Sequence, residues 1–256
     1  MENIEITGKK IFFLYPQTIV RNEVVSDLVM QEFEAYIVQD HVALRRVLKD
    51  FPNSIVFVNL DEKTVPEKEW AEWIHGIMTD PVTKQTSIGL LSSNASDDIK
   101  QKYLIEAEIT CGFTHISTDL KKVIAHLYQI LMQHNAMGRR KYIRITTDGD
   151  AQTTANMLVD GHFISASIRD ISSAGFSCIF PQDPGFQKGA LVPDIQLKLQ
   201  SSLIRTEAIV LGSHPDELTQ VYVFVFTPRT DSDVRFKIRK YIHTAIQNKM
   251  DIELKK

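Results

Sequence analysis

The stretch His162-Phe-Ile-Ser-Ala-Ser-Ile168 alternates apolar and polar residues, which is the period of a half-buried β-strand. The same alternation recurs in Ile195-Gln-Leu-Lys-Leu199 and in Val221-Tyr-Val-Phe-Val-Phe226. Turn residues such as Pro184-Gly185 and Asp160-Gly161 separate these runs. Several short strands at this spacing predict an antiparallel barrel or sandwich.

A helix is predicted to follow the last strand and to end the chain. Its apolar face comprises Val234, Ile238, Tyr241, Ile242 and Ile246. Acidic residues stand at 231 and 233, near the expected start, where the helix dipole favours negative charge.

The first half of the chain has a different pattern, because short apolar runs alternate with stretches of helical spacing. The predicted strands cover residues 11–15, 36–38, 55–58, 87–91 and 113–116, and the predicted helices cover 18–33, 41–51, 67–78, 97–108 and 119–134. This (βα)5 pattern predicts a parallel sheet with helices on both faces. A boundary at Asn135-Ala-Met-Gly138 divides the chain into predicted domains at 1–137 and 138–256.

Composition places the chain among globular proteins, with 43% hydrophobic and 24% charged residues in 256. Residues 1–138 carry 13 basic and 19 acidic side chains, and residues 139–256 carry 16 and 13. The resulting net charges are −6 and +3. A basic half suits an anionic ligand, but +3 is too weak to indicate a nucleic-acid polymer as partner.

Several classes of protein are not indicated. The sequence has no apolar run of the ~18 residues that a membrane helix needs, and no secretory signal, so we expect a cytoplasmic protein without membrane insertion. Cys111 and Cys178 lie too far apart for a CxxC metal site. HExxH, GxSxG and Walker motifs are absent, so we expect neither catalysis nor a metal or cofactor.

Two clusters of residues carry binding chemistry. The first is Arg139-Arg-Lys-Tyr-Ile-Arg144, in which Arg140 and Arg144 are four residues apart. Their planar guanidinium groups suit phosphate oxygens and the O6/N7 edge of guanine. The second is Asp170-Ile-Ser-Ser-Ala-Gly175, whose polar side chains can bond to nearby backbone and tighten a turn. The same R-x-x-x-R spacing at Arg235 and Arg239 is interpreted as a solvated helix face.

Together, R-x-x-x-R and D-x-S-x-x-G at the start of a small barrel resemble the PilZ domain over residues 139–250, and every motif position is filled. That family binds the bacterial second messenger cyclic di-GMP. The resemblance implies a six-stranded barrel with a terminal helix.

The resemblance also implies roles for individual residues. Arg140 and Arg144 would bind phosphate and guanine, Asp170 and Ser172 would meet the polar edge of a guanine, and Gly175 would let the backbone approach the nucleotide. An arginine at position 139 resembles family members that bind a stacked pair of ligands, although an ordinary exposed charge explains Arg139 equally well.

The N-terminal half resembles a response-regulator receiver domain in its (βα)5 pattern only. The acidic pair that holds Mg²⁺ in receivers is replaced by Tyr15-Pro-Gln17, and Asn59 stands where the acceptor Asp should end the third strand. Asp61 follows two residues later, and Ser92 matches the usual Ser/Thr. We therefore expect a degenerate receiver that binds a partner protein and is not phosphorylated.

Two functions remain open from the sequence. In the first, cyclic di-GMP binds at the junction between the domains and changes their arrangement and partner binding, as in regulators of motility, adhesion or biofilm. In the second, the chain is a scaffold that binds no small molecule.

Overall fold

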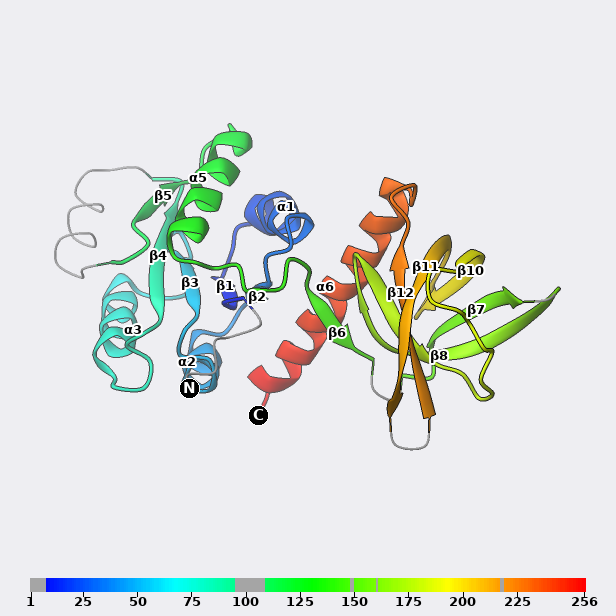
Figure 1. The fold of residues 1–256 in the computed structure, drawn as a ribbon. Coiled ribbons are helices and arrows are strands. Elements are labelled where there is room, and N and C mark those ends of the chain that lie inside the picture. The colour runs from blue at the N-terminus through cyan, green and yellow to red at the C-terminus, as the bar shows by residue number, and fades with distance from the viewer. Residues whose placement is uncertain (1–7, 95–108, 148–149, 160, 217–218) are drawn as a thin grey trace. The chain divides into compact units, whose positions relative to one another are not determined.

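The computed structural model describes residues 8–94, 109–147, 150–159, 161–216 and 219–256 (Figure 1). By contacts, the chain divides into two compact units. Residues 1–141 and 247–256 form unit 1, and residues 142–246 form unit 2. The helix predicted over 97–108 lies outside the described residues.

Unit 1 is built on a parallel sheet of five strands in the order β2-β1-β3-β4-β5. The strands are β1 (Ile11–Leu14), β2 (Ala35–Val38), β3 (Ile55–Asn59), β4 (Ser87–Ser92) and β5 (Phe113–His115). The helical segments are η1 (Val20–Val24), α1 (Val25–Met30), α2 (His41–Asp50), α3 (Glu67–Thr79) and α5 (Leu120–Gln133). The predicted parallel α/β sheet is confirmed.

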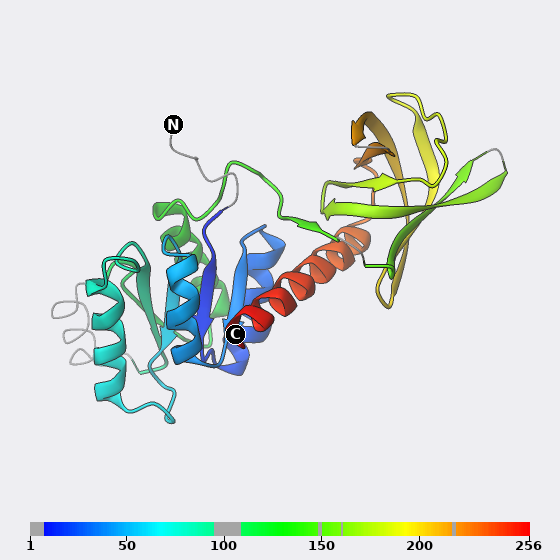
Figure 2. The same ribbon diagram turned by 90° about the horizontal axis from the view of Figure 1, so that it is seen from below.

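The continuous apolar runs of the strands are explained by burial on both faces. Ile11 and Phe13 of β1 pack into a core with η1, α1 and α5, while Phe12 faces the opposite side and stacks on Tyr36. Helices α1 and α5 cover one face of the sheet, and α2 and α3 cover the other (Figure 1 and Figure 2). The single helix predicted over 18–33 is a π-helical segment followed by a short α-helix.

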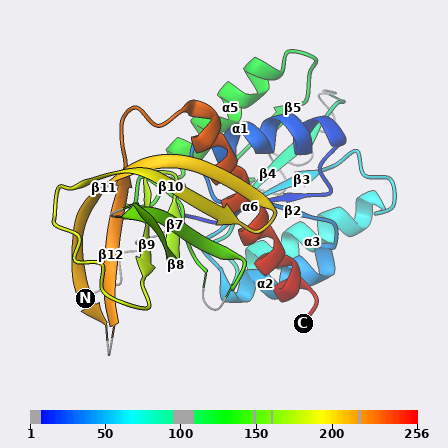
Figure 3. The ribbon, with the colours of Figure 1, turned by 90° about the vertical axis from the view of Figure 1, so that its right-hand side faces the viewer.

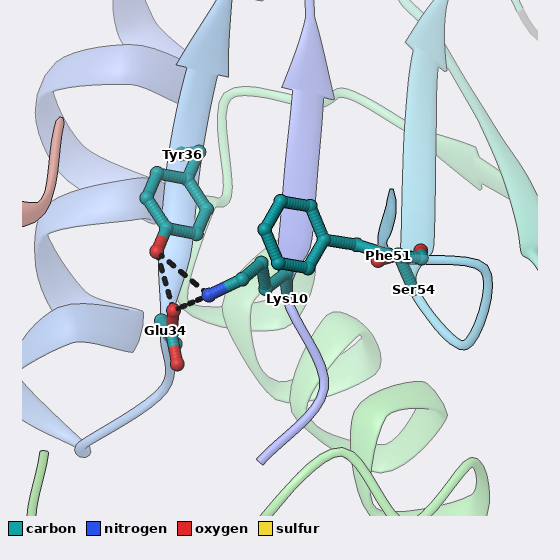
Figure 4. Close-up of polar contacts among 5 residues, drawn as sticks. All are labelled: Lys10, Glu34, Tyr36, Phe51 and Ser54. Carbon is teal, nitrogen blue, oxygen red and sulfur yellow. Dashed lines mark hydrogen bonds and ion pairs between the residues drawn. The ribbon is translucent and has the colours of Figure 1, made fainter. Parts of the chain in front are cut away.

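A polar cluster lies at the N-terminal ends of β1 and β2 (Figure 4). Lys10 forms an ion pair with Glu34 and lies 3.3 Å from the Tyr36 hydroxyl, which also donates to Glu34. The Lys10 ammonium lies 4.8 Å from the centre of the Phe51 ring, a cation–π distance. Burial, with the adjacent Glu34, raises the pKa of Tyr36. The cluster joins the first two strands through side chains as well as backbone.

Unit 2 contains a closed barrel of six antiparallel strands (Figure 3). Its sheet runs β8-β7-β10-β11-β12-β9 and closes where β9 pairs with β8, while β6 pairs with residues 170–172 of β8, beyond the part of β8 that pairs with β7. The strands are β6 (Arg144–Thr146), β7 (Thr153–Val159), β8 (His162–Ser172), β9 (Gly175–Ile179), β10 (Leu191–Leu199), β11 (Ser202–Asp216) and β12 (Thr219–Phe226). Closure leaves the six barrel strands without a free edge. The predicted barrel is confirmed.

The interior of the barrel is apolar, with Phe176 and Phe224 stacked at 5.0 Å between ring centres. The terminal helix α6 (Ser232–Leu254) follows β12, and its Ile238 and Ile242 are buried, as the apolar face predicted. Within the described ranges, no helix has the length and apolar character needed to cross a membrane.

Candidate ligand-binding site

Strand pairing brings parts of the two sequence motifs together. On β6, Arg144 lies opposite Ser172 of β8, and Thr146 lies opposite Asp170. The Arg144 guanidinium is 3.5 Å from Oδ1 of Asp170, and the Arg144 side chain is 46% exposed. One arginine of R-x-x-x-R is therefore paired with the carboxylate of D-x-S-x-x-G, and nearly half of its side chain is exposed to solvent.

A β-bulge sets the direction of the Asp170 side chain. The register between β8 and β9 shifts between Ile168 and Asp170, so Arg169 is the extra residue. Ile168 and Ile171 are both buried although they are three positions apart. A bulge moves all later side chains to the opposite face, so Asp170 leaves the inward face that alternation would have given it. Arg169 forms an ion pair with Asp216 at the end of β11.

The turn between β8 and β9 is held by the serine of the second motif. Ser172 lies opposite Gly175, so only Ser173 and Ala174 form the loop. The Ser172 hydroxyl donates to the Gly175 carbonyl at 3.2 Å and accepts from the Ala174 amide at 3.3 Å. Ser172 is 5% exposed, and its observed role is the turn-tightening one that the sequence predicts. Its contact with a guanine stays a prediction.

Gly175 is required by the packing of strands. A Cβ atom at this position would lie 2.1 Å from the carbonyl oxygen of Phe224 on β12. No side chain fits there without a movement of the backbone, and β9 and β12 can pair only because the residue is glycine. The predicted approach of the backbone to a nucleotide is a separate matter that stays a prediction.

Arg235, near the start of helix α6, also holds the turn between β8 and β9. Its guanidinium donates to the carbonyl of Ser173 and to that of Thr227, each at 3.0 Å. The interpretation of Arg235 as part of a solvated helix face is therefore wrong. The sequence contains no signal for this contact, because it depends on where α6 begins relative to the β8–β9 turn.

The motif arginine Arg140 and its neighbour Arg139 precede β6. Arg139 and Arg140 are both exposed, and contacts place them with unit 1. Their roles in ligand binding stay predictions.

In unit 1, Asp61 lies where the parallel strands end, the usual position of ligand sites in such sheets. Its Oδ1 accepts from the Ser92 hydroxyl at 2.6 Å. Its Oδ2 accepts from the Ser93 amide at 2.7 Å, the Ser93 hydroxyl at 2.8 Å and Gln17 Nε2 at 2.5 Å. Burial raises the pKa of Asp61, but these hydrogen bonds outweigh it and hold that pKa below its ordinary value. The carboxylate thus ties together loops that follow β1, β3 and β4.

Uncharged groups occupy the place of the acidic pair. Tyr15 has a φ of 51°, a left-handed conformation that is costly for a side-chain-bearing residue. Its hydroxyl lies 3.1 Å from His41 Nδ1, and its carbonyl accepts from the Asn59 amide at 2.8 Å. Across the described ranges, no group of three or more His, Cys, Asp or Glu side chains is arranged to hold a metal ion.

Replacing Asp61 with Ala is expected to lower the free energy of unfolding by about 1–3 kcal/mol at pH 7, because the buried Ser92 hydroxyl and the donors of Ser93 and Gln17 lose their acceptor. The folded-state pKa is depressed, so this stabilisation is present above the ordinary carboxyl pKa and is lost as pH falls through the folded value. Urea unfolding at pH 7 and pH 3 measures it, with Asp50→Ala, at an exposed helix end, as control. An equal difference between wild type and Asp61→Ala at both pH values would contradict the account.

Comparison with protein families gives one match, in the region of the barrel. Residues 138–243 match the family model described as "PilZ domain". None of the curated proteins matches the chain.

Several solved structures are similar to part of this chain at low sequence identity. The PilZ domain of YcgR from Escherichia coli with c-di-GMP is 14% identical, with a TM-score of 0.40 over 46% of this chain and 98% of that one. The complex of MrkH from K. pneumonia with c-di-GMP is 19% identical, with a TM-score of 0.39 over 47% and 57%. The Bacillus subtilis inhibitor of motility MotI/DgrA is 18% identical, with a TM-score of 0.37 over 44% and 53%. The match spans nearly all of the isolated YcgR domain but only a little over half of the MrkH and MotI chains.

Proposed function

We propose that this chain is an effector that binds cyclic di-GMP without catalysis, because residues 138–243 match the PilZ domain model. The observation that carries the proposal is the ion pair of Arg144 with Asp170, which joins the two motifs on neighbouring strands. A partly exposed guanidinium beside an outward carboxylate offers donors for phosphate or guanine O6/N7 and an acceptor for guanine N–H groups.

The ligand would be bound by the arginines at 139, 140 and 144 together with Asp170, Ser172 and Gly175. The boundary between unit 1 and unit 2 also falls within residues 138–144, between Lys141 and Tyr142. We propose that binding there shifts the arrangement of the two units and thereby changes the affinity for a protein partner of unit 1. The ligand shifts this equilibrium only by its difference in affinity for the two arrangements. The proposed biological role is that of a cytoplasmic regulator of motility, adhesion or biofilm formation.

A thermal-shift measurement separates this effector from a scaffold that binds no small molecule. A ligand that binds only the native state stabilises it by about 2.7 kcal/mol at a concentration of 100 Kd. We expect saturating cyclic di-GMP to raise the Tm of the wild-type chain and to have little effect on Arg140→Ala. Arg21→Ala removes an exposed arginine of unit 1 and serves as control. An unchanged Tm for the wild type supports the scaffold.

The number of ligands tests the role of Arg139. One cyclic di-GMP carries two negative charges and a stacked pair carries four, and Arg139, Arg140 and Arg144 together suit the larger number of phosphate oxygens. We expect two ligands per chain and increased protection of residues 138–144, with an ordering cost of about 1–2 kcal/mol per residue that the charged hydrogen bonds offset. Equilibrium dialysis counts the ligands, and hydrogen exchange reports the protection. A ratio of one that Arg139→Ala leaves unchanged, with equal exchange in both states, makes Arg139 an ordinary surface charge.

A further inference from the structure

Ser177 contacts the carboxylate of the binding motif from outside that motif. It lies on β9 directly opposite Asp170 of β8, and its hydroxyl donates to Asp170 Oδ2 at 2.6 Å. Ser177 is 4% exposed, so a ligand on the surface has little access to it. The other carboxylate oxygen of Asp170, Oδ1, faces Arg144.

We propose that Ser177 is a positioning residue for cyclic di-GMP binding, an inference that rests on the proposed function. The terminal torsion of an aspartate side chain has broad minima, so its carboxylate plane turns easily unless it is held. A buried hydroxyl on one oxygen holds that plane. Oδ1 is then presented to Arg144 and to the N–H groups of a guanine.

Two features of the fold determine where this contact lies. The bulge at Arg169 shifts the register beyond this pair, so that Ile168 lies opposite Cys178 and Asp170 does not share the inward face of Ile168. The turn of two residues, Ser173 and Ala174, sets the register in which Asp170 lies opposite Ser177. Ser177 and Asp170 are seven residues apart and form the third residue pair from this turn.

A serine that merely stabilises the hairpin would affect folding and leave the affinity of the folded protein unchanged. A serine that positions the ligand site, in contrast, acts through the Asp170 carboxylate that its hydroxyl holds. Removing the hydroxyl should therefore weaken ligand binding by folded protein, and the loss should depend on the presence of the Asp170 carboxylate.

The test is a double-mutant cycle with cyclic di-GMP as the probe, measured on the full chain up to millimolar ligand. We expect Ser177→Ala to weaken binding about three- to tenfold, Ser177→Thr to recover most of the affinity, and Ser177→Ala to add less than about twofold in an Asp170→Asn background. Ser167→Ala, at an exposed serine of the same strand as Asp170, should bind like the wild type. Urea unfolding confirms that each variant is folded.

The outcomes are distinguishable. If the wild type binds and Ser177→Ala binds equally well, or if Ser177→Ala costs the same with and without the Asp170 carboxylate, Ser177 has no positioning role. If the wild type itself does not bind cyclic di-GMP, the proposed function fails, and this inference fails with it.

Discussion

Arg144→Ala is expected to weaken cyclic di-GMP binding at least about tenfold, because a hydrogen bond to a charged group contributes on the order of 1.5–3 kcal/mol. The guanidinium is also the ion-pair partner of Asp170, so its loss removes a ligand contact and the support of a second one. Arg144→Lys keeps the charge but loses the planar pair of donors, and an intermediate affinity is expected.

The measurement is equilibrium dialysis with labelled ligand, and Arg205→Ala on β11 is the matched control because Arg205 is an exposed strand arginine of the same barrel. Nearly half of the Arg144 side chain is exposed, so we expect Arg144→Ala to fold. A folded Arg144→Ala with wild-type affinity would remove this residue from the site.

Gly175→Ala is expected to cause the largest loss of stability among the substitutions considered for the barrel. The added Cβ would sit 2.1 Å from the Phe224 carbonyl oxygen, inside any permitted contact, so β9 and β12 must separate locally. Overpacking of this kind costs about 1–3 kcal/mol, and the lost strand pairing adds to it.

Gly185→Ala is the matched control for Gly175→Ala. Gly185 has a φ of 67°, and no atom lies within 4 Å of the point that a Cβ would occupy, so Ala there meets only the left-handed conformation, about 1–2 kcal/mol. Guanidinium chloride unfolding of both variants compares the two effects. Equal or smaller destabilisation by Gly175→Ala would contradict the steric explanation.

Much of the fold follows from periodicity. The run Ile55–Val58 is apolar throughout because both faces of β3 are buried, and the alternation in 162–168 is that of a strand with one face inside a barrel. Local sequence determines these patterns because each residue's burial depends mainly on its own strand and face.

The bulge on β8 shows where periodicity reaches its limit. Alternation would point Asp170 inward with Ile168, yet Ile171 is the next buried residue. The spacing of Ile168 and Ile171 is a signal for a bulge, but a sequence alone does not tell which residue is extra. That answer depends on the register with β9, which places Asp170 opposite Ser177.

Contacts between segments far apart in the chain also could not be predicted from the sequence. The side-chain amide of Gln247 bonds to both the N–H and the C=O of Ile37 on the edge strand β2, each at 2.9 Å and 210 residues away. Arg235 reaches the turn at Ser173 in a similar way. An exposed glutamine or arginine on a helix has the same local pattern whether or not such a partner exists, so these contacts carry no sequence signature.

The central claim, that this chain binds cyclic di-GMP through its barrel, is tested most directly by isothermal titration calorimetry of the full chain. We expect saturable binding of cyclic di-GMP, little heat with GMP at the same concentration, and loss of the binding heat in the double variant Arg144→Ala/Asp170→Ala. The contradicting result is a folded wild-type chain that gives no saturable heat, or one whose binding is unchanged in that double variant.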